Sequence, residues 1–135
     1  MEFDTKIKVI LRERLEPWQE LNVTAFLISG IAGTQNIVGD AYVDADGVKY
    51  LPMSQQPIVI LSAGSEKLSE VMQKATEKGM AVSIYTKELF STYNDADNRA
   101  EIMKRRTSEL DLAGVAIRGA RNPLDRITKG IVMHR

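Results

Sequence analysis

Short β-rich runs alternate with helical segments along the whole chain, and this alternation restricts the fold more than any other feature. The runs predicted to form strands are residues 6–12, 57–63, 81–85, 112–118 and 131–134. The segments predicted to form helices are 17–32, 65–79, 94–106 and a single turn over 123–128. Strands separated by helices are typical of a sheet covered on both faces. The sequence therefore predicts one α/β domain over residues 1–135, a three-layer α/β/α sandwich with a mixed, mostly parallel sheet of four to five strands.

Composition narrows the chemistry that such a domain can perform. The 135 residues include no cysteine and one histidine, which removes disulfides, thiolate zinc sites and most other transition-metal sites. We therefore expect no metal and no cofactor. No apolar run approaches the roughly 18 residues of a membrane span, and the first residues do not resemble a secretory signal. A cytoplasmic protein without membrane attachment is expected.

Charge is unevenly distributed although the formal net charge is zero. Residues 104–135 hold eight Lys and Arg against three Asp and Glu, whereas residues 1–103 hold ten against fifteen. The basic end could bind an anion or a phosphate group, or its charges could simply be solvated at the surface. This end contains no aromatic residue, which disfavours general nucleic-acid binding.

The predicted first helix opens with polar side chains although its body is apolar. In α/β sheets, ligands bind beyond the carboxyl ends of the strands, so Arg12, at the end of the first strand, is expected near this helix. Trp18 would then form one wall of a cleft, and Gln19 and Asn22 would form hydrogen bonds with a ligand. The alternative is that Trp18 belongs to the core and the amides bind loop backbone groups.

The body of the same helix is apolar on almost every side. Leu21 and Ile28 are therefore expected in the core, where truncation to alanine would cost roughly 2–5 kcal/mol. The same pattern would arise if a second copy covered part of the helix. A homodimer is expected, and the sequence leaves both sources of burial open.

A second polar cluster follows the fourth predicted strand. Arg118 and Arg121 carry forked, permanently charged donors that suit phosphate or carboxylate, and Asp125 and Lys129 are spaced to pair on a helix. Because this cluster also follows a strand end, we expect it to face the same pocket as the first helix and to bind a small anionic ligand. The alternative is a salt-bridge network that holds the last connection together.

Two further motifs indicate structure more than function. The segment Asp44–Gly47 has some features of a calcium loop but lacks the closing glutamate, so a hairpin turn within residues 41–52 is predicted. His134 is the only imidazole, so a serine–histidine–acid triad would have to use it. The expected role of His134 is that of a residue in a terminal strand.

Several segments together resemble an uncharacterised bacterial family, the domain-of-unknown-function family number two thousand. These segments are LRERLEPWQELNVTAFLISGIAG, YVDADGVKYLPM, QPIVILSA, TKELFSTYNDADNRAE and LDLAGVAIRGARNPLDRITKGIVMH. The resemblance implies the fold of the type II peptidyl-tRNA hydrolases, with which that family is grouped. It implies no established activity.

The resemblance to these hydrolases implies that this chain has a similar cleft, but it does not extend to their catalytic residues. The residues that resemble their final strand and turn are Gly119, Asp125, Thr128 and Gly130. Asp125 is the one weak candidate for an acid or base. The hydrolases carry a lysine at the start of their first helix, which residues 19–22 lack, and an acid-Ala-Gly-x-Thr segment, which residues 85–88 lack.

Two functions follow from these patterns. The first is a binding or regulatory module for a small anionic or nucleotide-like ligand in a cleft at the strand ends. The alternative is a hydrolase or transferase that acts on an ester or a tRNA-linked substrate.

Overall fold

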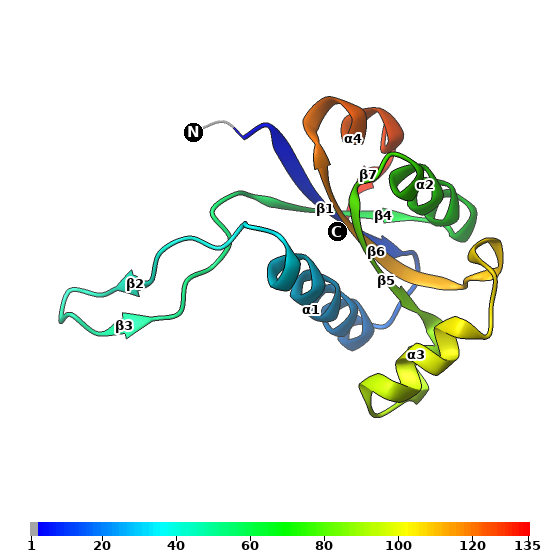
Figure 1. The fold of residues 1–135 in the computed structure, drawn as a ribbon, viewed down its shortest axis with the longest axis horizontal. Coiled ribbons are helices and arrows are strands. Elements are labelled where there is room, and N and C mark those ends of the chain that lie inside the picture. The colour runs from blue at the N-terminus through cyan, green and yellow to red at the C-terminus, as the bar shows by residue number, and fades with distance from the viewer. Residues whose placement is uncertain (1–2) are drawn as a thin grey trace.

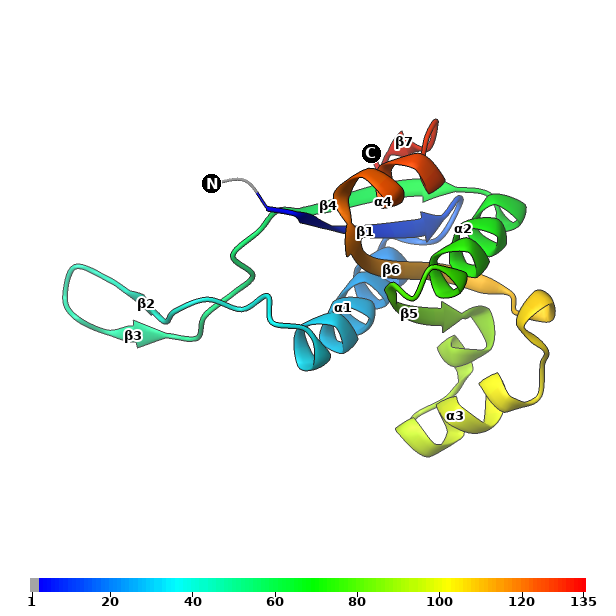
Figure 2. The same ribbon diagram turned by 45° about the horizontal axis from the view of Figure 1, so that its top comes forward.

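The computed structural model describes residues 3–135, which form a five-stranded sheet with helices on both faces (Figures 1 and 2). The order of the strands across the sheet is β5-β6-β1-β4-β7. Their bounds are Thr5–Arg12 for β1, Ile58–Ala63 for β4, Ala81–Thr86 for β5, Leu112–Ala120 for β6 and Val132–Met133 for β7. The predicted α/β sandwich is confirmed.

The helices are divided between the two faces of the sheet. Their bounds are Pro17–Thr34 for α1, Ser65–Glu77 for α2, Asp95–Met103 for α3 and Arg121–Ile127 for α4, with short 3-10 turns η1 at Lys87–Ser91 and η2 at Thr107–Glu109. One core packs α1 against the sheet, and a second core packs α2 and α4 against the other face. Strand residues alternate between the two cores, as the period of two along a strand requires.

The directions of the strands differ from the prediction. β1 and β4 are parallel, but β6 is antiparallel to both β1 and β5, and β7 is antiparallel to β4. The expectation of a mostly parallel sheet is therefore wrong. A parallel connection between β5 and β6 would need a helix that packs across the sheet. α3 buries no residue and lies beyond the end of β5 (Figure 2), so the chain returns antiparallel as β6.

The first helix lies unusually close to the sheet at Gly114 of β6. A Cβ atom at this position would lie 2.7 Å from Cγ1 of Val23 and 3.1 Å from Cδ1 of Leu27. The buried face of α1 consists of Val23, Leu27 and Ile31. Leu21 is on the opposite side and 74% exposed, so the expectation that it belongs to the core is wrong for a single copy of the chain.

A hairpin arm, residues 38–54, projects from the body of the molecule beyond the C-terminal end of α1 (Figures 1 and 2). Its strands are β2 (Tyr42–Val43) and β3 (Lys49–Tyr50), which pair antiparallel. At the tip, Oδ1 of Asp44 accepts hydrogen bonds from the backbone N–H groups of Asp46 and Val48, and Gly47 has a φ of 82°. The predicted hairpin turn is confirmed, and the Asp44 carboxylate serves to build it.

Within residues 3–135, no helix has the combined length and apolar character that crossing a membrane requires.

A candidate aromatic cleft between the first helix and the segment after β5

Aromatic side chains gather in a cleft between the N-terminal half of α1 and the segment that follows β5. The cleft has a volume of about 360 Å³. The rings that line it are those of Trp18, Phe26, Tyr85, Phe90 and Tyr93. Trp18 and Phe26 share α1, Tyr85 is one of the two buried residues at the end of β5, and Phe90 lies in η1. The strand end and the helix start therefore bring distant parts of the chain together.

Four of the rings form a chain of contacts that holds them in place. The centroids of Trp18 and Phe90 are 5.6 Å apart, those of Tyr85 and Phe90 are 5.0 Å apart, and those of Phe26 and Tyr85 are 6.1 Å apart. These distances are typical of favourable aromatic pairs. Trp18 is nevertheless 58% exposed and Phe26 56% exposed. Rings that are fixed yet open to solvent can accept a flat ligand by stacking.

Directed polar groups lie among these rings. The Tyr85 hydroxyl donates a hydrogen bond to Oδ1 of Asn22 over 3.2 Å. Burial raises the pKa of Tyr85 above its usual 10.0, so the hydroxyl remains a donor at neutral pH. Because this bond uses the carbonyl oxygen of Asn22, it orients the Nδ2 amide, which has no hydrogen-bond partner within residues 3–135 and can donate to a ligand.

The outer wall of the cleft is polar. The Thr92 hydroxyl donates to Oδ1 of Asn98, and Oδ1 of Asn94 accepts from the backbone N–H of Asp97 at the start of α3. Among the described residues that line the cleft, Asp95 is the one charged group, and Arg99 of α3 pairs with its carboxylate over 2.5 Å. The lining therefore suits a neutral ligand better than a charged one.

A second, more apolar cavity continues the cleft along the groove between α1 and α3. It has a volume of about 410 Å³ and shares Phe26, Tyr85 and Leu89 with the aromatic cleft. Ile102 and Met103 of α3 line its far end. A ligand longer than one ring could therefore extend from the aromatic cleft into this groove.

Of the four residues predicted to line a cleft near the start of α1, two line it and two do not. Trp18 and Asn22 are on its wall. Oε1 of Gln19 instead accepts a hydrogen bond from the backbone N–H of Glu16 over 2.9 Å, as part of a capping box that begins the helix. Leu11 of β1 packs on the α1 side of the sheet, so the next residue, Arg12, points to the α2 side. There Arg12 pairs with Asp111 over 3.0 Å.

The arginine-rich cluster lies at the other end of the sheet. Because β6 is antiparallel to β1, Arg118 is opposite Ile7 rather than opposite the end of β1. Arg118 donates to Oε1 of Gln35 over 3.1 Å, and Arg121 donates to the backbone carbonyl of Phe3. The expectation that both polar clusters face one pocket is therefore wrong, because it assumed parallel strands.

Asp125 and Lys129 are also remote from the cleft. Asp125 lies on α4, on the face of the sheet opposite α1, where Lys6 and Lys8 bind its carboxylate over 2.8 and 2.9 Å. These hydrogen bonds hold the pKa of Asp125 below its usual 3.8. A carboxylate held in its ionised form is poorly suited to general acid catalysis at neutral pH. α4 ends before Lys129, which is exposed, so the predicted pairing within one helix does not form.

A row of three side chains around His134 was missed by sequence reasoning. Nδ1 of His134 lies 2.5 Å from Oγ of Ser62, and Nε2 of His134 lies 2.5 Å from Oε2 of Glu20. The backbone N–H of His134 donates to the carbonyl of Ile60, which extends the pairing of β7 with β4. The residues come from α1, β4 and the C-terminal end, so no sequence spacing could indicate that they meet.

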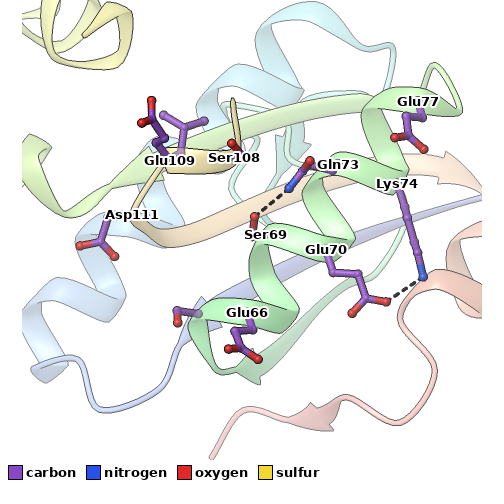
Figure 3. A pocket seen from close by; sticks show the side chains of 11 residues that line it. Glu66, Ser69, Glu70, Gln73, Lys74, Glu77, Ser108, Glu109 and Asp111 are labelled. Atoms are coloured by element: carbon purple, nitrogen blue, oxygen red, sulfur yellow. Dashed lines mark hydrogen bonds and ion pairs between the residues drawn. The ribbon is translucent and has the colours of Figure 1, made fainter. Parts of the chain in front are cut away.

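A wider depression lies elsewhere, between α2 and the segment before β6, and has a volume of about 720 Å³ (Figure 3). Its carboxylates are those of Glu66, Glu70, Glu77, Glu109 and Asp111. Several of its polar groups satisfy one another, since Lys74 donates to Glu70 over 2.7 Å and Gln73 donates to Ser69 over 2.9 Å. Charged groups that pair at an open surface are ordinary solvated side chains. The aromatic cleft is the better candidate site.

These features define a small α/β domain with a mostly antiparallel sheet and an aromatic cleft beside its first helix. Residues 5–135 match the family model described as a protein of unknown function, DUF2000, and the chain belongs to this family. The chain is also similar to the solved structure of a protein of unknown function from Agrobacterium tumefaciens strain C58. The two are 43% identical with a TM-score of 0.94, over 99% of this chain and 100% of the other. A comparison with the curated proteins gives no match.

Proposed function

We propose that this protein is a binding module whose aromatic cleft holds a small, flat organic ligand such as a nucleobase or a similar heterocycle. The observation that carries the proposal is the gathering of five rings, one of which, Tyr85, is hydrogen-bonded to Asn22. Small-molecule sites are mostly apolar clefts of about 300–1,000 Å³ with a few directed polar groups, and this cleft fits that description.

The chemistry of the lining narrows the class of ligand. Rings stack on either face of a heterocycle, and the Asn22 amide can donate to a ring nitrogen or a carbonyl oxygen. Because the described lining includes no Lys or Arg side chain to bind a phosphate, the ring of a nucleotide-like ligand is a better fit than its phosphate. A binding role is therefore proposed for Trp18 and Asn22 but not for the remote Arg118 and Arg121.

Titration with nucleosides tests this site directly because Trp18 is the single tryptophan of the chain. Adenosine or guanosine that stacks on Trp18 is expected to change its fluorescence in a saturable way. Replacing Asn22 with alanine should weaken binding about 10-fold, the value of one well-placed hydrogen bond.

The matched control is Asn122→Ala, which removes an exposed amide far from the cleft and should leave the titration unchanged. A thermal-shift screen of nucleobases and nucleosides gives an independent readout, since a ligand at 100 times its Kd adds about 2.7 kcal/mol of stability. The absence of any saturable signal across such a panel would contradict the proposed function.

The row around His134 favours a second candidate, the hydrolase or transferase acting on an ester. In this candidate, Oγ of Ser62 attacks the carbonyl carbon of an ester while its proton moves to Nδ1 of His134. Glu20, 2.5 Å from Nε2, would stabilise the imidazolium. The proton then passes to the departing alcohol, and water releases the acyl group from Ser62 in a second step.

Labelling with a fluorophosphonate distinguishes this candidate from a binding module. An activated Ser62 should give a covalent adduct that peptide mass spectrometry locates, and His134→Gln should reduce its rate of formation at least ~100-fold. Ser29→Ala, which alters an exposed serine of α1, should not affect the adduct. If Ser62 stays unlabelled, the row has only the structural role of tying the C-terminal end to α1.

A further inference from the structure

The arm carries apolar side chains that the rest of the described chain does not cover. The large apolar residues exposed on it are Val38, Tyr42, Val43, Val48, Tyr50, Leu51 and Met53. Leu51 is 86% exposed, and every residue from 40 to 51 is exposed. Exposed apolar surface of this extent, gathered on one projecting segment, is typical of a protein–protein contact.

A second uncovered apolar surface lies on α1, on the side that faces away from the sheet. Leu21 and Ala25 are four residues apart on this outward face, and Trp18 and Phe26 lie at its edge toward the cleft. Val23 and Leu27 already fill the face toward the sheet. A helix that is apolar on all sides is normally buried on all sides, so the outward face of α1 lacks a cover.

We propose that residues 38–54 form a dimerisation arm, which packs on the outward face of α1 around Leu21 in a second copy of this chain. Within one copy the arm projects beyond the C-terminal end of α1, whereas Leu21 is near the N-terminal end (Figure 1). If the two α1 helices run antiparallel about a two-fold axis, each arm reaches the N-terminal half of the partner's helix.

A second copy fits both surfaces better than an unrelated partner does. The arm and the outward face of α1 belong to the same chain, so a two-fold axis lets each copy cover both surfaces of the other in one step. Each exposed apolar side chain of the arm would bury roughly 100 Å² of surface in this contact. Summed over the two arms, the buried area exceeds the ~1,000 Å² that a specific interface needs. The contact would also bring the partner's arm next to Trp18, at the edge of the aromatic cleft.

Sedimentation equilibrium of matched variants tests this interface. The full chain should have about twice the monomer mass of 15.1 kDa. Leu51→Asp on the arm and Leu21→Asp on α1 should each raise the dimer Kd by about 100-fold or more, as expected for the centre of an interface. Lys78→Asp, at an exposed position after α2 on the other face of the sheet, should leave the Kd unchanged. Unchanged circular dichroism would show that all variants fold.

Cross-linking locates the contact because the chain has no cysteine of its own. Leu21→Cys and Leu51→Cys should form a disulfide-linked dimer when the two variants are mixed and oxidised, and much less when either is oxidised alone. A wild-type monomer would overturn the proposal, as would a dimer that neither aspartate variant weakens. Cross-linking of Leu51→Cys with itself but not with Leu21→Cys would also overturn it, because the arms would then pair with each other.

Discussion

Replacing Leu27 with alanine should lower the free energy of unfolding by roughly 2–5 kcal/mol, the cost of a cavity in a well-packed core. Leu27 is 1% exposed and packs where α1 meets Gly114 of β6. Val23 also packs on Gly114, so it keeps the helix from moving inward to fill the gap. Chemical denaturation measures the loss as a shift of the midpoint.

Leu21→Ala is the matched control, since it makes the same change on the same helix. Leu21 is 74% exposed, so the loss in the monomer should be about 0.5 kcal/mol or less. The comparison is made on the Leu51→Asp background, in which the proposed dimer is weakened. Equal losses for the two alanine variants would show that the outward face of α1 packs on its own chain.

Asp125→Asn should destabilise the protein by about 1–3 kcal/mol near neutral pH, because it leaves Lys8 without its carboxylate. Lys8 is 8% exposed and otherwise donates to Oγ1 of Thr128 over 2.6 Å. Glu70→Gln is the matched control. Glu70 also pairs with two lysines, Lys67 and Lys74, but all three side chains are at least 40% exposed, so a loss of about 0.5 kcal/mol or less is expected.

The pH dependence of the Asp125→Asn loss follows from the direction of the pKa shift. Hydrogen bonds from Lys6, and then from Lys8, lower the pKa of Asp125 in the folded state below its usual 3.8. The contribution of a carboxylate with a lowered pKa is complete above its unfolded pKa and disappears as the pH falls through the folded value. The difference between wild type and variant should therefore be constant down to about pH 5 and shrink below about pH 4. A constant difference at every pH would contradict this account.

The elements of the fold could be predicted from the sequence, but the directions of the strands could not. Local periodicity and capping residues determine where α1 begins and where β1 and β4 lie, so these appear at the expected places. Strand direction depends on which partner a strand meets. The pairing of Ile7 with Arg118 joins residues more than a hundred positions apart, and no local pattern reports it.

The candidate site shows the same division between local and distant information. Trp18 and Asn22 are four residues apart on one helix, so helical spacing predicted that they lie on the same face. Tyr85 and Phe90 join them only because η1 folds back beside α1 after β5 ends. The arginines were placed in the same pocket by assuming parallel strands, and the antiparallel return of β6 separates them.

The central position of β1 has a consequence for synthesis of the protein. Its neighbours are β4, which ends at Ala63, and β6, which begins only at Leu112. On the ribosome, one edge of β1 can pair with β4 as soon as that strand has emerged, but the other edge stays open until β6 has followed. Closing the sheet is therefore a late, long-range event, and until then the open edge of β1 exposes the nascent protein to aggregation.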